Sequence, residues 1–433
     1  MSTASLSQVD SVVLLKPRPK THPSVNLVLL PLLPTPSPRD PLPSEIWARI
    51  LRHTMEPEPD ARTAWEGQAA RLRLVRVCKS FKEVMLPLLY SRPHLPTYEH
   101  FVLLCERILD ADRKWDNLRR IAYSTPGRWV NSLDLTLCSH LTPAQNLKFD
   151  RLISQVFPVV PFLALLILHS TVDLTRQAMQ SLGDSQAIRS LKDLRGIHVP
   201  PHGYFHQSEA LTSLLRSCAN LRHLELLGSG LDADAELPDP EVVYSPPQIT
   251  LPQLHSMSIL HTPFSPVLHA LSRAELPSLR ALTISIYVDA EGSDATRFLE
   301  AHGENLTTLT LAPAQTWPPT TTQIPTNVLV ICPNLRYLSL PTTPVSLALT
   351  PPAEPSKLTI LSVPRPNMEF LRDVIEPLLP SLREIRVREV RYLKRAMGVG
   401  AAGAGSSAVM LDWRRRLARR RVAVLDALGK DGP

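Results

Sequence analysis

Apolar residues beyond residue 125 recur in one pattern, in which two variable positions separate the first and second apolar residues and one separates the second and third. Seven copies are clear: Leu221/Leu224/Leu226, Leu254/Met257/Ile259, Leu279/Leu282/Ile284, Leu306/Leu309/Leu311, Leu335/Leu338/Leu340, Leu358/Leu361/Val363 and Leu382/Ile385/Val387. Three weaker copies precede them: Val130/Leu133/Leu135, Leu163/Leu166/Leu168 and Leu194/Ile197/Val199. Each copy predicts a short strand, because successive side chains of a strand point to opposite faces.

The stretches between these predicted strands indicate helices. Amphipathic spacing covers residues 175–190, 207–218, 265–273, 294–302 and 369–379. A strand and a helix cannot each bury an apolar face alone, so neighbouring units are expected to stack into a curved solenoid. The copies begin 23 to 33 residues apart, which overlaps the period of leucine-rich repeats and exceeds it in several units. The sequence therefore predicts an α/β fold, with an irregular leucine-rich-repeat solenoid of a strand plus a helix per repeat over residues 125–395.

Helices are also predicted before the repeats. In residues 42–51, Pro43 stands in the first turn, where its missing N–H costs nothing, and Glu45 lies where the helix dipole favours an anion. Helical periodicity returns over residues 61–79, and the spacing of apolar residues from Tyr98 to Trp115 predicts an amphipathic linking helix.

The two ends of the chain differ from its centre in composition. Residues 1–40 are rich in proline without helical or strand periodicity, and predict a disordered arm. Residues 396–409 are rich in Ala and Gly, as in a flexible linker, and residues 411–428 could form a basic helix. Six of the eight residues from Arg414 to Arg421 are arginine, which is compatible with a nuclear localisation patch, an anionic contact or a solvated helix face.

Composition narrows the class of protein. The chain has 43 prolines and only 15 glycines, which fits many short elements joined by stiff turns. Its five cysteines show no paired short spacing, so we expect neither a disulfide framework nor a zinc cluster. No apolar run approaches the length of a membrane span, so we expect a protein of the cytoplasm or nucleus.

Two motifs precede the repeats. Residues 42–51 read Leu-Pro-Ser-Glu-Ile-Trp-Ala-Arg-Ile-Leu, and residues 77–81 read Val-Cys-Lys-Ser-Phe. The first matches the opening Leu-Pro-x-Glu and apolar helix of the F-box family, and the second matches its later Val-Cys-Lys-x-aromatic segment. With Leu-Pro-Leu-Leu-Tyr at residues 86–90, the chain resembles F-box proteins of filamentous fungi. The resemblance places an F-box module at residues 41–92, followed by the linking helix within residues 93–124.

The resemblance also implies a function. An F-box protein with leucine-rich repeats is a non-catalytic substrate-recognition subunit of a Skp/cullin/F-box-type ubiquitin ligase, whose F-box docks to a Skp-type adaptor and whose repeats bind a protein target. No cofactor is implied, and other subunits transfer ubiquitin. The residues expected to contact the adaptor are Leu42, Pro43, Ile46, Ile50, Leu51, Val77, Cys78 and Phe81.

The target would bind the concave face of the solenoid. Since the second and third apolar positions of each repeat point into the core, the residues before and between them should face the concave surface. These residues are Asp134, His198, His223, Glu225, Ser256, Ser258, Thr283, Thr308, Thr310, Tyr337, Ser339, Ser362, Glu384 and Arg386. The row is rich in hydroxyls and mixed in charge, which suits hydrogen-bonded protein recognition better than phosphate binding. Within it, His198, His223, Glu225, Tyr337, Glu384 and Arg386 are the expected target contacts.

Other residue clusters offer little chemistry. Cys218 and Cys332 occupy matching positions before a repeat, in Cys-Ala-Asn-Leu and Cys-Pro-Asn-Leu, which indicates a buried packing role. His198, His202 and His206 have the spacing of helical metal ligands, but Pro200 and Pro201 would break that helix. The sequence shows no phosphate loop, nucleophile elbow or HExxH motif, so we expect no enzyme activity.

Three alternatives stay open. The chain could be a leucine-rich-repeat scaffold unconnected to ubiquitin, in which residues 42–115 only cap the repeats, and adaptor binding would separate this from the ligase hypothesis. An enzyme hidden in irregular repeats would need a nucleophile, base or metal set that the sequence does not indicate. A nucleic-acid-binding protein would depend on the C-terminal arginines.

Overall fold

We describe the chain from a computed structural model. It describes residues 43–54, 72–114, 125–139, 141–199, 205–228, 231–232, 248–262, 265–285, 294–313, 316–317, 327–341, 350, 352, 355–364, 379–388 and 415–426. Contacts divide the chain into two compact units, Met1–Thr54 and Met55–Pro433. The predicted N-terminal arm and the Ala/Gly linker lie outside the described residues. Among the helices that are described, none is long and apolar enough to cross a lipid bilayer.

The described part of the first unit is helix α1, Ser44–Thr54. The amide of Ile46 donates to the carbonyl of Pro43, so the first turn begins at the proline. Glu45 lies in that turn and basic residues occupy the last one, as the helix dipole favours. The helix predicted over residues 42–51 is confirmed within the described residues and continues to Thr54.

Helices also open the second unit. They are α3 (Lys79–Ser91), α4 (Tyr98–Arg113) and α5 (Pro126–Trp129). The predicted linking helix is confirmed as α4. Of the residues 61–79 in which helical periodicity returns, those described are helical at 72–74 and form a turn at 75–77. Cys78 then starts a new helix as its N-cap, with Sγ accepting a hydrogen bond of 3.4 Å from the amide of Phe81.

Eleven parallel strands form the main sheet of the second unit, in chain order. They are β1 (Ser132–Asp134), β2 (Leu165–Ile167), β3 (Asp193–His198), β4 (His223–Leu227), β6 (Ser256–Leu260), β7 (Ala281–Ser285), β8 (Thr308–Ala312), β10 (Tyr337–Ser339), β11 (Ile360–Val363), β12 (Glu384–Val387) and β13 (Ala423–Asp426). Two short strands, β5 (Leu231–Asp232) and β9 (Thr316–Trp317), pair with each other instead. All ten predicted strands are present.

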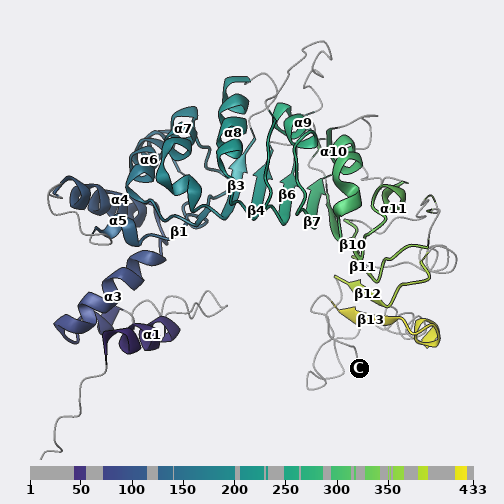
Figure 1. The fold of residues 1–433 in the computed structure, drawn as a ribbon, viewed down its shortest axis with the longest axis horizontal. Coiled ribbons are helices and arrows are strands. Elements are labelled where there is room, and N and C mark those ends of the chain that lie inside the picture. The colour runs from purple at the N-terminus through teal and green to yellow at the C-terminus, as the bar shows by residue number, and fades with distance from the viewer. Residues whose placement is uncertain are drawn as a thin grey trace, which may run out of the picture. The chain divides into compact units, whose positions relative to one another are not determined.

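Helices between the strands lie on one side of this sheet (Figure 1). They are α6 (Pro143–Val156), α7 (Arg176–Asp184), α8 (Phe205–Ser217), α9 (Pro266–Ser272), α10 (Asp294–His302) and α11 (Val328–Ile331), with short 3-10 turns η2 (Phe157–Val159), η3 (Gln186–Arg189) and η4 (Gly303–Asn305). Four of the predicted helices are confirmed as α7, α8, α9 and α10; the fifth, over residues 369–379, falls almost entirely outside the described residues. Helix α6 was not predicted, although Thr142 and Gln145 form a capping box at its start.

The third repeat begins three residues earlier than the sequence suggested. Leu194, predicted as its first apolar position, pairs with Leu224, which is a second position. Leu191 is therefore the first position, and it is fully buried. The error arises because the register between β3 and β4 shifts between Leu194 and Ile197. A bulge at Gly196, which the apolar pattern does not reveal, adds one residue to the strand.

The C-terminal prediction is wrong in part. A helical turn covers Arg415 to Arg419, but the predicted helix over residues 411–428 does not continue beyond it. β13 follows and pairs with β12, so that Val424 lies opposite Ile385. Val422 and Val424 are buried on alternate positions, which is the strand periodicity that the preceding run of arginines concealed.

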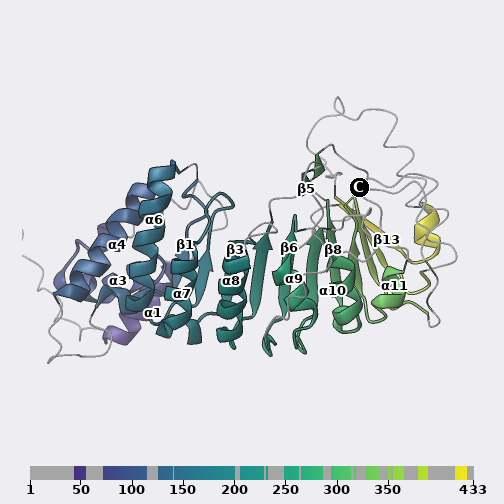
Figure 2. The same ribbon diagram turned by 90° about the horizontal axis from the view of Figure 1, so that it is seen from above.

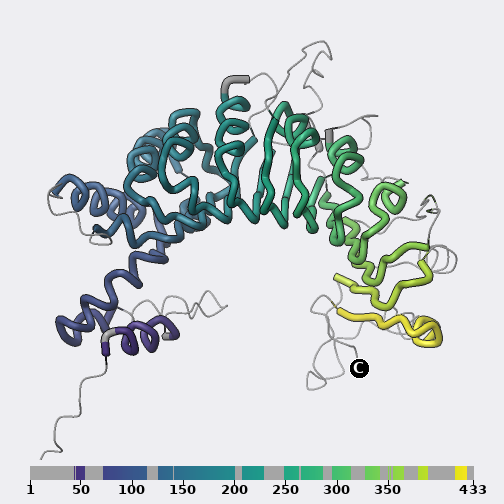
Figure 3. Tube along the Cα trace, viewed as in Figure 1, coloured from purple at the N-terminus to yellow at the C-terminus, as the bar shows by residue number. Residues whose placement is uncertain are grey.

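One continuous apolar cluster, from Leu95 to Val424, fills the space between sheet and helices. All three apolar positions of every repeat belong to it, and each buried leucine contributes about 1.5 to 3 kcal/mol. At the N-terminal end, Phe101 of α4 stacks on Phe149 of α6 with ring centroids 4.7 Å apart. Helix α4 thus covers the first repeat, and the repeats follow one another in chain order along the trace of the second unit (Figure 3).

Replacing Gly196 by alanine should destabilise the second unit. Gly196 has φ of +73°, and an added Cβ would lie 2.3 Å from the carbonyl oxygen of Leu168. We expect Gly196→Ala to lower the free energy of unfolding by about 1 to 3 kcal/mol or more, measured by urea denaturation.

Gly183 provides a matched control, because it lies within α7 and an added Cβ would only touch Leu214 at 3.8 Å. Gly183→Ala should raise stability by about 0.5 to 1 kcal/mol. If Gly196→Ala and Gly183→Ala changed the free energy of unfolding equally, this would contradict the placement of Gly196 in a bulge with positive φ.

Candidate functional site

The main sheet has one face opposite the helices, here called the polar face (Figure 1). By the strand register, side chains that do not enter the core form two rows across it. The strand register aligns the first row as His223, Ser256, Ala281, Thr308, Tyr337, Ile360 and Glu384. It aligns the second row as Glu225, Ser258, Thr283, Thr310, Ser339, Ser362 and Arg386. The structure therefore brings together most of the residues predicted to face a target.

Accessibility differs along these rows. Most of the side chains are half-buried, as expected for a sheet face, and Asp134 at the N-terminal end is exposed. Ser339 and Ser362 are buried, with 2% and 1% of their surface exposed. These two residues were predicted to face the concave surface, but they offer little surface to a partner.

Charges at the two ends of the polar face are paired within single strands. On β3, Arg195 Nη2 lies 2.7 Å from Asp193 Oδ1. On β12, Arg386 Nε lies 2.6 Å from Glu384 Oε1, and this hydrogen bond raises the pKa of the guanidinium. Arg386 also lies over the ring of Tyr337, 5.9 Å from its centroid. The predicted contacts Tyr337, Glu384 and Arg386 thus form one connected cluster.

Strand β4 carries polar groups with unused hydrogen-bonding capacity on the polar face. Within the described part of the chain, neither His223 nor Glu225 has a side-chain hydrogen bond or ion pair. Hydroxyls lie on the β6 side of them, with Ser256 opposite His223 and Ser258 opposite Glu225. A partner could satisfy these groups without first breaking contacts inside the protein.

Apolar side chains, which the pattern of polar positions does not reveal, also lie on this face. They are Leu165 and Ile167 on β2, Leu227 on β4, Leu260 on β6 and Ile360 on β11, all half-buried. Each of these residues adjoins a buried second or third apolar position of its repeat, and this spacing could have predicted that its side chain lies on the polar face.

His198 makes two contacts of its own. Its Nε2–H donates to the carbonyl of Ser170, and its Nδ1 lies 3.5 Å from Asp173 Oδ1. The residue ends β3, whereas His206 belongs to α8, so the two do not share a helix. His202 falls outside the described residues. Among those that are described, no three His, Cys, Asp or Glu side chains gather as a metal site.

The residues expected to contact an adaptor differ in exposure. On α1, Ile46 and Ile50 keep 43% and 42% of their surface exposed, one turn apart, and Pro43 is exposed before them. Leu51 is buried at 3%, so it offers little surface, and Leu42 falls outside the described residues.

The later segment that resembles the F-box family lies in the second unit. Val77 is 62% exposed and Cys78 is exposed, while Phe81 is half-buried in the first turn of α3. Large apolar side chains with this much exposure are candidates for contact with a protein partner.

The four buried cysteines lack the features of a nucleophile. Cys218 and Cys332 are buried, which confirms the predicted packing role, and burial raises the pKa of each thiol to about 12. Burial likewise raises the pKa of Cys138 to about 11 and that of Cys105 still further. A thiol with so high a pKa is almost wholly protonated at neutral pH and reacts slowly.

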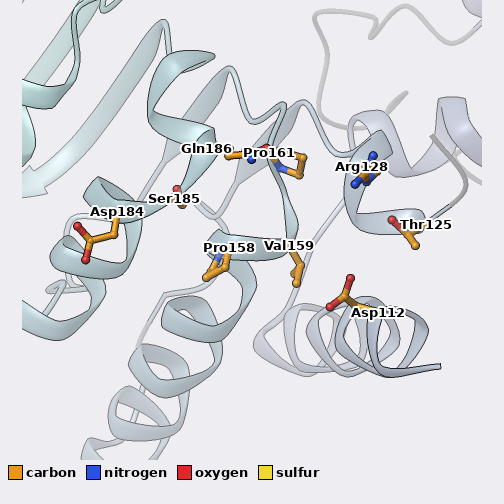
Figure 4. A pocket seen from close by; sticks show the side chains of 9 residues that line it. All are labelled: Asp112, Thr125, Arg128, Pro158, Val159, Pro161, Asp184, Ser185 and Gln186. Atoms are coloured by element: carbon orange, nitrogen blue, oxygen red, sulfur yellow. The ribbon is translucent and has the colours of Figure 1, made fainter. Parts of the chain in front are cut away.

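A pocket of about 410 Å³ lies beside the first repeats, and the sequence did not predict it. Asp112, Thr125 and Arg128 line one side of it, and Asp184, Ser185 and Gln186 line the other, with Pro158, Val159 and Pro161 between them (Figure 4). Its described lining contains no nucleophile paired with a base, so the pocket provides no basis for covalent catalysis.

Comparison with known proteins adds no further constraint, since no family model matches the chain and no curated protein is significantly similar to it.

Thiol labelling should follow burial. Among the five cysteines, we expect only Cys78 to react with iodoacetamide near pH 8, because a pKa of about 12 leaves roughly one Cys218 or Cys332 thiol in ten thousand as thiolate. Mass spectrometry of the modified chain measures this, and all five should react in denaturant. Rapid labelling of Cys218 in the folded chain would contradict its buried position.

Proposed function

We propose that the chain is a non-catalytic substrate-recognition subunit of a Skp/cullin/F-box-type ubiquitin ligase. In this proposal the F-box region binds a Skp-type adaptor, and a leucine-rich-repeat solenoid over residues 125–395 holds a protein target. The observation that carries it is the exposed pair Ile46 and Ile50, which lies within the segment resembling the F-box opening.

The exposed apolar surface of α1 supports the adaptor contact. A surface helix normally turns such residues toward a core, yet Ile46 and Ile50 remain about two-fifths exposed while Leu51 is buried. Helix α1 therefore has exposed apolar side chains in addition to a buried one. A helix with an unburied apolar face is suited to docking against a protein groove.

The free energies of burial and association show that the adaptor contact needs more than these two isoleucines. Burying the remaining surface of Ile46 and Ile50 would contribute about 1 to 2 kcal/mol each. Association itself costs about 4 to 15 kcal/mol, so two isoleucines are insufficient. Val77, which is 62% exposed, and the neighbouring Cys78 are the further contacts we propose.

The repeat architecture supports the target-binding part of the proposal. Eleven strands in chain order with helices on one side are what stacked strand–helix repeats produce. The polar face has hydroxyls, His223 and Glu225 on β4, and half-buried apolar residues such as Leu260 on the adjacent strand β6. Such a mixture resembles the composition of protein–protein interfaces, where polar contacts surround apolar anchors.

Catalysis is assigned to other subunits. Within the described residues, the buried cysteines and the pocket beside the first repeats provide no nucleophile with a base. Holding a target near the ligase would raise the effective concentration of its lysines, which is how a receptor accelerates transfer without making bonds. We place this activity in the cytoplasm or the nucleus.

Adaptor binding tests the proposal. We expect the full-length chain to co-purify with the Skp-type adaptor of its own organism. The double variant Ile46→Asp/Ile50→Asp should reduce the recovered adaptor at least about tenfold, because it places two charges in an apolar contact.

The matched control replaces two exposed leucines outside α1, Leu103 on α4 and Leu147 on α6, which are 63% and 74% exposed. Leu103→Asp/Leu147→Asp should keep adaptor binding. If the folded wild-type chain binds no adaptor, a leucine-rich-repeat scaffold unconnected to ubiquitin becomes the better account.

A further inference from the structure

The main sheet has one edge where its strands begin, opposite the arrowheads in Figure 2. Six basic residues and two threonines are aligned in a row along this edge. Each row residue immediately precedes a strand from β3 to β12: Lys192, Arg222, His255, Arg280, Thr307, Arg336, Thr359 and Arg383. The amide of each donates to the carbonyl of the one before it, at 2.7 to 3.0 Å. Equivalent backbone positions thus align the side chains one strand apart. We call this row the basic edge.

The cations of the basic edge are accessible. All of its basic residues are exposed, and the side chains of Lys192, Arg222, Arg336 and Arg383 have neither hydrogen bond nor ion pair within the described ranges. Arg280 directs Nη1 to backbone carbonyls, including that of Leu279 at 3.0 Å.

Neighbouring acids do not neutralise the basic edge. Asp193 adjoins Lys192 in the chain, but its carboxylate pairs with Arg195. Glu384 adjoins Arg383, but its carboxylate pairs with Arg386. These two ion pairs leave Lys192 and Arg383 as uncompensated charges at the two ends of the row.

The C-terminal arginines extend the same edge. Arg419 ends a helical turn and Arg420 and Arg421 form the turn before β13, all three exposed, and the amide of Ala423 donates to the carbonyl of Arg383 at 2.8 Å. The arginine run, which the sequence suggested was a separate basic helix, therefore ends beside the basic edge and enlarges it.

We infer that the basic edge binds an acidic segment of a protein partner, and this inference rests on the proposed role in target recognition. Eight adjacent strands at about 4.8 Å spacing give the row a length of about 34 Å. An extended peptide of about ten residues spans the same distance. Its carboxylates would face the guanidinium groups, while its backbone would lie beside hydroxyls of the polar face such as Ser256 and Thr308.

A peptide fits this surface better than a single-stranded nucleic acid does. Binding of unpaired bases relies on aromatic side chains on which the bases stack. The basic edge contains no Phe, Tyr or Trp among its described residues, and the first row of the polar face has only Tyr337 of these three types, over which Arg386 already lies. Hydroxyl groups beside a row of cations favour hydrogen bonds to a peptide backbone and salt bridges to its side chains.

A charge-reversal experiment on the full-length chain tests the inference. The probe is fluorescein-labelled deca-glutamate, with deca-glutamine as the uncharged comparison, and fluorescence anisotropy measures binding. The wild-type chain should bind deca-glutamate more tightly than deca-glutamine, and added salt should weaken this binding. Arg222→Glu/Arg336→Glu/Arg383→Glu should reduce the affinity by about tenfold or more.

The control carries the same change of charge on helices α4 and α6, as Arg107→Glu/Lys148→Glu/Arg151→Glu, all at exposed positions. It should bind deca-glutamate with no more than about a threefold loss. Circular dichroism confirms that both variants fold. Equal losses in the two variants would overturn the inference, because binding would then follow net charge alone. Tighter binding of a single-stranded oligonucleotide, lost in the edge variant, would also overturn it.

Adaptor co-purification of the edge variant separates this inference from the proposed function. If the variant Arg222→Glu/Arg336→Glu/Arg383→Glu still binds the adaptor but no longer binds deca-glutamate, both the inference and the proposed function are supported. If the wild-type chain binds deca-glutamate through the basic edge but no adaptor, the surface stands and the ligase assignment fails.

Discussion

The main sheet depends on one constraint, that no repeat can bury its apolar residues by itself. Strands such as β1 and β10 have three residues each, too few to persist alone. Stacking places Leu309 beside Leu282 and Leu338, and hydrogen bonds between successive strands hold them in register. A slip of one residue would turn every leucine to the opposite face, so the register is fixed by burial.

The same register decides which side chains remain available for function. Once the leucines are buried, the alternate positions of each strand fall on the polar face, and the residue before each strand falls on the basic edge. Within-strand pairs such as Glu384 with Arg386 neutralise part of this surface and leave other charges, Glu225 among them, available to a partner. Recognition in the proposed ligase receptor would therefore use positions that the core does not need.

Much of this arrangement could be predicted from sequence because apolar periodicity reports burial directly. Prediction from apolar periodicity failed where another interaction determined the backbone conformation. Gly196 adopts a φ of +73° in a bulge, which moved the predicted start of the third repeat from Leu191 to Leu194. The arginines before β13 suggested a helix, because charge concealed the alternation of Val422 and Val424. The contact of His198 with Ser170 joins the end of β3 to the turn after β2, which no local pattern connects.

The sequence by itself determined that leucine-bearing strands alternate with helices, and which side chains of each strand avoid the core, because these follow from local periodicity. Only the tertiary structure decided which of those side chains stand next to one another. Arg222, Arg336 and Arg383 are far apart in the chain, and only the ladder of parallel strands places them in one row. Electrostatic surfaces depend on distance in space, and stacking sets that distance once every repeat has buried its leucines.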